Sequence, residues 1–203
     1  MERLESVDAF AVSQEKEWVE IFTGFETRNR YRVLDASGTE LLYIAGEAEG
    51  SFWTRNILQS IRPFTIYIMT PDQSRVLILK RPFRFYFHKL DIFDPGWNLL
   101  GTVQRRFSVL RRNYSVLNSS GHEVLQLFGP ILHPWTFIVQ RAGREIGRIT
   151  KKWSGLFKEA FTKADNFGVT FPAELDINLK TLLLGAVFLI DFVHFERKGG
   201  GGD

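Results

Sequence analysis

The C-terminal part of the chain contains a stretch that is apolar around the whole circumference of a helix. Across residues 175–195 large apolar side chains follow one another without the polar stripe of a surface helix. Ten uncharged residues separate Lys180 from Asp191, whereas a helix that spans a bilayer needs roughly 18 to 20. A charge near the membrane centre would cost about 2.5 to 3.5 kcal/mol. The pattern therefore predicts a helix enclosed by the rest of the fold.

Upstream of this helix, short β-branched and aromatic runs alternate with polar turns. The turns fall at residues 35–38, 70–74, 94–96, 118–121 and 141–143, and residues 64–69 and 76–79 are examples of the flanking runs. Glycine provides the positive φ angle that tight turns require. Five hairpins that close into a barrel would have no free edges and would create an interior for a single hydrophobic helix. The sequence therefore predicts a mainly β fold, a closed antiparallel barrel around the C-terminal helix.

Seven short segments carry a resemblance to a known family. They are residues 23–27 (TGFET), 62–65 (RPFT), 81–82 (RP), 147–155 (GRITKKWSG), 159–162 (EAFT), 164–168 (ADNFG) and 189–192 (LIDF). In this order they resemble the phospholipid scramblase family, over residues 22–196. The resemblance implies a tubby-like fold, a twelve-stranded antiparallel β-barrel threaded by a C-terminal hydrophobic helix. It also predicts an N-terminal segment at residues 1–21, a single domain at 22–198 and a disordered Gly-rich tail at 199–203.

Two functions remain open at this point. The resemblance implies ATP-independent, bidirectional movement of phospholipids between membrane leaflets, with stimulation by calcium. The alternative is a peripheral tubby-like module that binds anionic lipid or regulates a partner without transport, because a short enclosed helix offers no evident path for headgroups across a bilayer. The chain contains no recognised catalytic motif, and its four histidines lack metal-ligand spacing. We therefore expect no enzyme activity, and we expect Asp191 and His194 on the helix to make satisfied polar contacts.

The net charge of +3 is unevenly distributed along the chain. Residues 51–163 carry a net charge of +12, whereas residues 1–50 carry −6 and residues 164–203 carry −3. A basic surface attracts anionic lipid headgroups, with about 1 kcal/mol for each basic residue near the membrane. An anionic phospholipid membrane surface is therefore the expected partner, and nucleic acid is a second, less favoured one. The candidate lipid-binding residues are Lys80, Arg81, Arg105, Arg106, Arg111, Arg112, Lys151 and Lys152.

The resemblance also implies a calcium-binding segment, an EF-hand-like loop of twelve residues directly before the C-terminal helix. Its counterpart here is residues 163–174. An EF-hand needs oxygen ligands at loop positions 1, 3, 5 and 12 and glycine at position 6. Lys163 and Phe167 occupy positions 1 and 5, which leaves Asp165 and Glu174 as the acidic candidates, with Gly168 at position 6. The sequence therefore predicts calcium binding no tighter than about millimolar.

The absence of cysteine and the composition of the N-terminus bear on the cellular setting. With no cysteine, the chain has no disulfide-linked partner, no thiolate metal site and no S-palmitoylation. Residues 1–20 are charged and lack the apolar core of a signal peptide, which predicts an intracellular protein at the cytoplasmic face of a membrane. Residues 147–156 resemble a nuclear import segment of animal relatives, but three basic residues are too few for a basic cluster, so we do not expect nuclear localisation.

Overall fold

The computed structural model describes residues 2–15, 30–48, 63–72, 74–82, 88–108, 112–151 and 166–194. These residues form a β-barrel with a helix inside it. The helices are α1 (Glu2–Glu5) and α3 (Ile177–His194). The strands are β1 (Ala9–Glu15), β2 (Arg30–Leu34), β3 (Glu40–Ala48), β4 (Phe64–Met69), β5 (Arg75–Arg81), β6 (Lys89–Phe93), β7 (Leu99–Arg106), β8 (Arg112–Asn118), β9 (Glu123–Gly129), β10 (Thr136–Arg141), β11 (Arg144–Lys151) and β12 (Asn166–Thr170).

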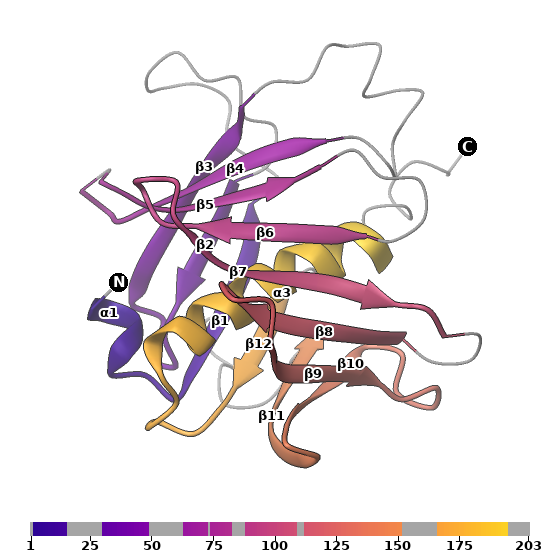
Figure 1. Ribbon diagram of the computed structural model, residues 1–203. Coiled ribbons are helices and arrows are strands. Elements are labelled where there is room, and N and C mark those ends of the chain that lie inside the picture. Colours follow the sequence, from indigo (N-terminus) through magenta and orange to yellow (C-terminus); the bar gives the residue numbers. More distant parts are fainter. Residues whose placement is uncertain are drawn as a thin grey trace, which may run out of the picture.

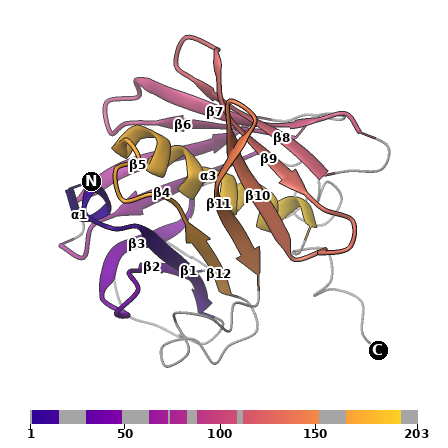
Figure 2. The same ribbon diagram turned by 90° about the horizontal axis from the view of Figure 1, so that it is seen from below.

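The barrel closes through β1, which pairs with both β2 and β12. Val12 lies opposite Val33 on one side and opposite Phe167 on the other. All twelve strands are antiparallel to their neighbours, and the sheet forms a complete ring without a free edge. In both views the strands surround α3 (Figures 1 and 2). The predicted closed antiparallel barrel is confirmed. The ring includes β1, which lies before residue 22, where the sequence placed the start of the domain.

Side chains of Asp and Asn stabilise the predicted tight turns. The carboxylate of Asp35 accepts hydrogen bonds from the backbone N–H groups of Ser37 and Thr39, both at 2.8 Å. The amide oxygen of Asn118 accepts from the N–H of His122 at 2.9 Å. Gly38 has a φ angle of 84°, a region that L-residues with a Cβ atom rarely adopt. All five hairpins predicted from these turns are present.

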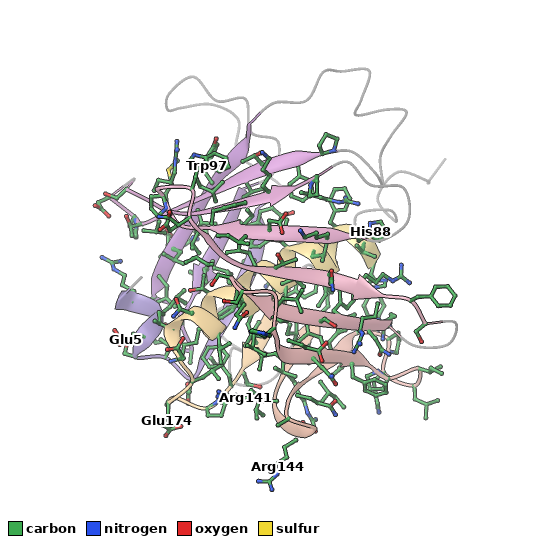
Figure 3. The ribbon with its side chains drawn as sticks, viewed as in Figure 1. Glu5, His88, Trp97, Arg141, Arg144 and Glu174 are labelled. Atoms are coloured by element: carbon green, nitrogen blue, oxygen red, sulfur yellow. The ribbon has the colours of Figure 1, made fainter. Side chains whose placement is uncertain are left out.

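The two ends of the barrel differ because consecutive strands alternate in direction. The five tight turns all follow even-numbered strands and lie at one end, which we call the turn end. Strands β1, β3, β5, β7, β9 and β11 finish at the opposite end, which we call the loop end. Helix α3 follows β12 and runs from the turn end to the loop end. Glu5 and Glu174 lie near the start of α3, whereas His88 lies beside its last turn (Figure 3).

Helix α3 is the centre of the hydrophobic core. Leu183, Leu184, Leu189 and Ile190 have no exposed surface, and they pack with the inward-facing side chains of the strands. By length and composition α3 is apolar enough to cross a membrane, yet 78% of that span is buried in the protein. The enclosed helix predicted from the sequence is confirmed, at Ile177–His194 rather than at residues 175–195.

Two glycines let α3 approach β6 and β7 closely. A Cβ atom on Gly185 of the helix would lie 2.6 Å from Cδ1 of Ile92 in β6. A Cβ atom on Gly101 in β7 would lie 2.3 Å from the backbone oxygen of Leu117 and 2.8 Å from Leu182 of the helix. Real Cβ atoms do not approach other atoms so closely, because interiors are already close-packed. Glycine at these two positions therefore sets the distance between helix and sheet.

Lys180 fixes the start of α3 to the N-terminal segment at the turn end. Its ammonium group has no exposed surface and donates hydrogen bonds to the carbonyl oxygens of Glu5 at 2.6 Å, Val7 at 2.8 Å and Ala173 at 2.9 Å. Three acceptors match the three donors of an ammonium group. The buried charge is thus solvated by backbone rather than by water, and it joins the two ends of the chain.

Candidate functional site

The basic residues predicted to bind lipid occupy the strand ends near the loop end of the barrel. Lys80, Arg105, Arg106 and Lys151 lie in the last residues of β5, β7 and β11, and Arg112 begins β8. The described members of the predicted set therefore share one end of the barrel, although β5 and β11 lie on opposite sides of the ring. Side chains alternate between the two faces of a strand, and this alternation divides the set into an inner group and an outer group.

Arg81 belongs to the inner group and lies against the last turns of α3. Its side chain shares a face with the core residue Leu79, and the residue is 1% exposed. The guanidinium group lies 4.0 Å from the ring centre of Phe192 and within 2.7 Å of Nδ1 of His88. A cation over an aromatic face is stabilised by the ring quadrupole. Arg81 therefore packs inside the barrel and is not available to a lipid headgroup.

Lys151 is also internal, because it forms an ion pair with the helix. Its Nζ atom lies 3.4 Å from Oδ1 of Asp191, and the hydroxyl group of Tyr31 donates to Oδ2 at 3.4 Å. Both charged side chains are at least nine-tenths buried. Removing either partner of such a pair leaves a charge in a medium of low dielectric constant. The expected satisfied polar contact of Asp191 is confirmed, and Lys151 serves the fold rather than the surface.

His194 ends α3 beside Tyr114 and two arginines. Nε2 of His194 and the hydroxyl group of Tyr114 are 2.7 Å apart. Burial lowers the pKa of His194 to about 4, and the nearby cations Arg105, Arg112 and His88 add to this decrease. Burial also raises the pKa of the Tyr114 hydroxyl. At neutral pH the pair is therefore an uncharged hydrogen bond, as expected for a satisfied polar contact.

Arg112 is half-buried and organises the connection between β9 and β10. Its guanidinium group donates to the carbonyl oxygens of Pro130 and His133, both at 3.2 Å, and to that of Pro134. The group also lies 4.7 Å from the ring centre of Phe137. These contacts use the donors of Arg112 within the protein. We therefore assign Arg112 a structural role in this loop.

Lys80 and Arg106 form the outer group and are exposed to solvent. Nζ of Lys80 lies 5.5 Å from the ring centre of Trp97. Arg106 is exposed and forms a surface ion pair with Glu123 at 3.3 Å, a contact that contributes little to stability. Arg105 is half-buried at the inner edge of the barrel. Among the described members of the predicted set, Arg105 and Arg106 therefore remain for a headgroup surface at the loop end, whereas the ammonium group of Lys80 lies beside Trp97 of the β6–β7 turn. Arg111 and Lys152 lie outside the described residues.

The segment proposed as a calcium loop is partly a strand of the barrel. Asn166–Thr170 form β12, which pairs with β1 and β11, and Phe167 is 3% exposed. A strand paired on both sides does not have the geometry of an EF-hand loop. Glu174 is exposed at the turn end, and Asp165 lies outside the described residues. In the described part of the chain no group of three or more His, Asp or Glu side chains could hold a metal ion.

Exposed apolar side chains at the loop end were not anticipated from the sequence. Phe107, Ile131 and Leu132 are 79%, 64% and 87% exposed. The sequence does contain a signal for two of them, because Ile131 and Leu132 stand between Pro130 and the pair His133 and Pro134, in a turn where small polar residues are usual.

Comparison with known proteins identifies the family of this barrel. The family model "Scramblase" matches residues 1–197. The chain belongs to the scramblase family. Phospholipid scramblase 1 of Mus musculus is 33% identical over 213 residues, which cover 98% of this chain and 64% of that protein. Phospholipid scramblase 2 of Bos taurus is 32% identical over 214 residues, which cover 98% of this chain and 72% of that protein.

A solved structure of low sequence identity supports the fold of this chain. A crystal structure of a protein from Arabidopsis thaliana covers 93% of both chains with a TM-score of 0.51 at 12% identity. The likeness agrees with the tubby-like barrel that the resemblance implied. The chain spans just under two thirds of the length of phospholipid scramblase 1 from mouse and rat. The remaining parts of those relatives have no counterpart in this alignment.

Proposed function

We propose that this protein moves phospholipids between the two leaflets of a membrane in both directions and without ATP. The observation that carries the proposal is the match of the scramblase family model across residues 1–197, together with phospholipid scramblases about one third identical over almost the whole chain. Movement of a lipid makes and breaks no covalent bond, so the proposal requires no catalytic residue.

The packing of the barrel limits where a lipid can pass. The lumen is filled by α3, whose central residues have no exposed surface. Packing of this density leaves no channel for a headgroup. We therefore place the lipid path outside the barrel, along surfaces that the protein presents to the membrane, and not through its lumen.

The proposed partner is the anionic surface at the cytoplasmic face of a membrane. Arg105 and Arg106 would supply the attraction, because basic side chains near a charged membrane each contribute about 1 kcal/mol. We propose that calcium is not required at micromolar concentration, since the segment that would supply an EF-hand holds Lys163 in the first ligand position and continues into β12.

Reconstitution into vesicles tests this function. The purified protein is incorporated into vesicles that carry a fluorescent phospholipid, in the absence of nucleotide and with a calcium chelator. We expect the outer-leaflet reductant dithionite to bleach nearly all of the fluorescence, whereas protein-free vesicles lose only about half. Heat-denatured protein is the matched control. Bleaching of half of the signal by the folded protein, with and without calcium, would contradict the proposal and leave a peripheral lipid-binding module.

A further inference from the structure

The loop end of the barrel presents large apolar side chains to water. Among the described residues, Phe107, Ile131 and Leu132 are the most exposed of the large apolar side chains. Phe107 follows the end of β7, and Ile131 and Leu132 follow the end of β9. Strand β8 separates these two strands, so their ends lie about 10 Å apart at the usual strand spacing. The three side chains therefore fall within one small area at the same end of the molecule.

The loop that carries Ile131 and Leu132 is well organised. The N–H of His133 donates to the carbonyl oxygen of Pro130 at 3.3 Å, which places Ile131 and Leu132 at the two central positions of a turn. The N–H of Thr136 donates to the carbonyl oxygen of His133 at 3.0 Å and forms a second turn. Arg112 holds both turns through its three carbonyl contacts. The two turns and the contacts of Arg112 therefore hold Ile131 and Leu132 in a defined position.

The residue types at this turn are unusual within the molecule itself. Tight turns favour Gly, Pro, Asn, Asp and Ser, and turns at the opposite end follow this rule, with Pro95 and Gly96 or Ser119 and Ser120 at their tips. Trp97 at the turn end is 46% exposed, but it packs against Phe93 and Lys80. Two branched aliphatic side chains at a turn tip contribute nothing to the turn. Their exposure therefore points to a ligand that covers them.

We propose that the loop end docks on a phospholipid bilayer, with Phe107, Ile131 and Leu132 inserted at the boundary between headgroups and acyl chains. The choice of partner rests on the proposed lipid function and on charge, because Arg105 and Arg106 directly precede Phe107 and would meet anionic headgroups. In this arrangement the apolar side chains would reach the acyl chains, while the neighbouring cations would lie at the level of the headgroups. A nucleic acid would use the cations but not the aliphatic pair.

This docking sets the orientation of the protein on the membrane. The long axis of α3 runs from the turn end to the loop end, so its last turn would face the bilayer and its first turn the cytoplasm (Figure 3). The turn end, with Asp35, Asp72 and Asp94 in its tight turns, would point away from the anionic surface.

Site-specific labelling tests the orientation, and the absence of cysteine in the chain makes it simple. Leu132→Cys and Ser119→Cys each carry one environment-sensitive fluorophore, at the loop end and at the turn end. On addition of phosphatidylcholine vesicles that contain phosphatidylserine, the label at position 132 should shift to the blue and become protected from iodide. The label at position 119 should remain fully quenchable. Protection at 119 instead, or protection at neither position while the protein sediments with the vesicles, would overturn the inference.

Removal of the apolar tips tests their contribution. The triple variant Phe107→Ser, Ile131→Ser and Leu132→Ser should bind the same vesicles at least about tenfold more weakly, a change that needs only about 1.4 kcal/mol. Leu99→Ser, at an exposed apolar position near the turn end, is the matched control and should bind as the parent does. Equal binding by the triple variant, or no binding by the parent, would contradict the docking. Because binding is measured without transport, a failure here is distinct from a failure of the flipping assay.

Discussion

The charged residues of α3 show how single side chains are accommodated in an apolar core. Lys180 reaches backbone carbonyl groups 173 and 175 residues away in the sequence, and Asp191 reaches Tyr31 across 160 residues. The sequence predicted a satisfied polar contact for Asp191 but made no such prediction for Lys180. The partners themselves depend on the closure of the barrel, which no local pattern contains. For the same reason the sequence placed Lys151 on the surface, although it pairs with Asp191 inside.

Replacement of Lys180 tests the three carbonyl contacts. Lys180→Met keeps the length of the side chain but leaves the carbonyl oxygens of Glu5, Val7 and Ala173 without their donor. We expect the free energy of unfolding to fall by about 2 to 4 kcal/mol, because each buried group without a partner costs about 1 to 3 kcal/mol and partial rearrangement recovers some of it. Urea titration measures the change. Lys89→Met, which removes a partly exposed ion pair with Asp91, is the control and should cost less than Lys180→Met, on the order of 1 kcal/mol. Equal losses would contradict the role of the three carbonyl contacts.

The low pKa of His194 predicts a pH-dependent stability. The imidazole is neutral in the folded protein down to about pH 4, but it takes up a proton below about pH 6.5 in the unfolded chain. Its contribution to stability is therefore present above pH 6.5 and is lost as the pH falls toward 4. Between pH 7 and pH 4 the parent should lose on the order of 2 kcal/mol more than His194→Gln, after allowance for solvent at the barrel end.

Urea titrations at several pH values measure this difference, and His122→Gln in an exposed turn is the control. Arg105, Arg112 and His88 surround His194 and contribute to the decrease in its pKa. Parallel pH profiles for the parent and His194→Gln would show that the imidazole is solvated and that the pair with Tyr114 has little effect.

At the scale of elements, local periodicity decided what could be predicted. The hairpins follow from turn chemistry at Asp35 or Asn118, and the buried helix follows from its uninterrupted apolar surface. The direction of a basic side chain at a strand end depends instead on its place in the alternation of inward-facing and outward-facing residues along the strand. Arg81 shares a face with Leu79 and points inward, whereas Lys80 beside it points outward. The presence of a basic pair in the sequence does not show which of its two side chains points into the barrel and which points to solvent.

The enclosure of α3 is tested by a charge at its centre. Leu183 has no exposed surface, and Leu183→Asp would bury a carboxylate without a partner at a cost of several kcal/mol, against a total stability of about 5 to 15 kcal/mol. We expect the variant to fail to fold, with loss of the cooperative unfolding transition. Asn178→Asp, at an exposed position of the same helix, should fold normally. A folded Leu183→Asp protein that has lost only membrane binding would mean that α3 lies outside the barrel.

The two ends of the barrel differ in the chemistry of their surfaces. The loop end carries the half-buried Arg105, the exposed Arg106 and the apolar tips, whereas the turn end is closed by short polar turns and the Lys180 contacts. The uneven charge along the sequence predicted a basic surface but not its place, because the closure of the ring decides which strand ends lie at each end of the barrel. The exposure of Ile131 and Leu132 was not predicted, because the residue preferences of turns do not show whether a ligand covers a turn.

Salt dependence tests the electrostatic part of membrane binding. Binding to vesicles that contain phosphatidylserine should weaken as salt rises from low to physiological concentration, because surface attraction is screened beyond about 8 to 10 Å. Arg105→Gln with Arg106→Gln should weaken binding at low salt and should unfold at nearly the same urea concentration as the parent. Arg148→Gln, exposed and paired with Glu145 on β11, is the matched control. Binding that depends on neither salt nor these arginines would contradict the charge-based part of the account.

The most direct test of the proposed function separates transport from adsorption. Flipping of fluorescent phospholipids is measured in reconstituted vesicles, without nucleotide, at a salt concentration that abolishes binding of the added protein to preformed vesicles. We expect the folded protein to equilibrate the label between the leaflets under these conditions and the heat-denatured protein to fail. Salt-reversible binding of the folded protein without any flipping would contradict the proposal and would leave a barrel that only docks on membranes.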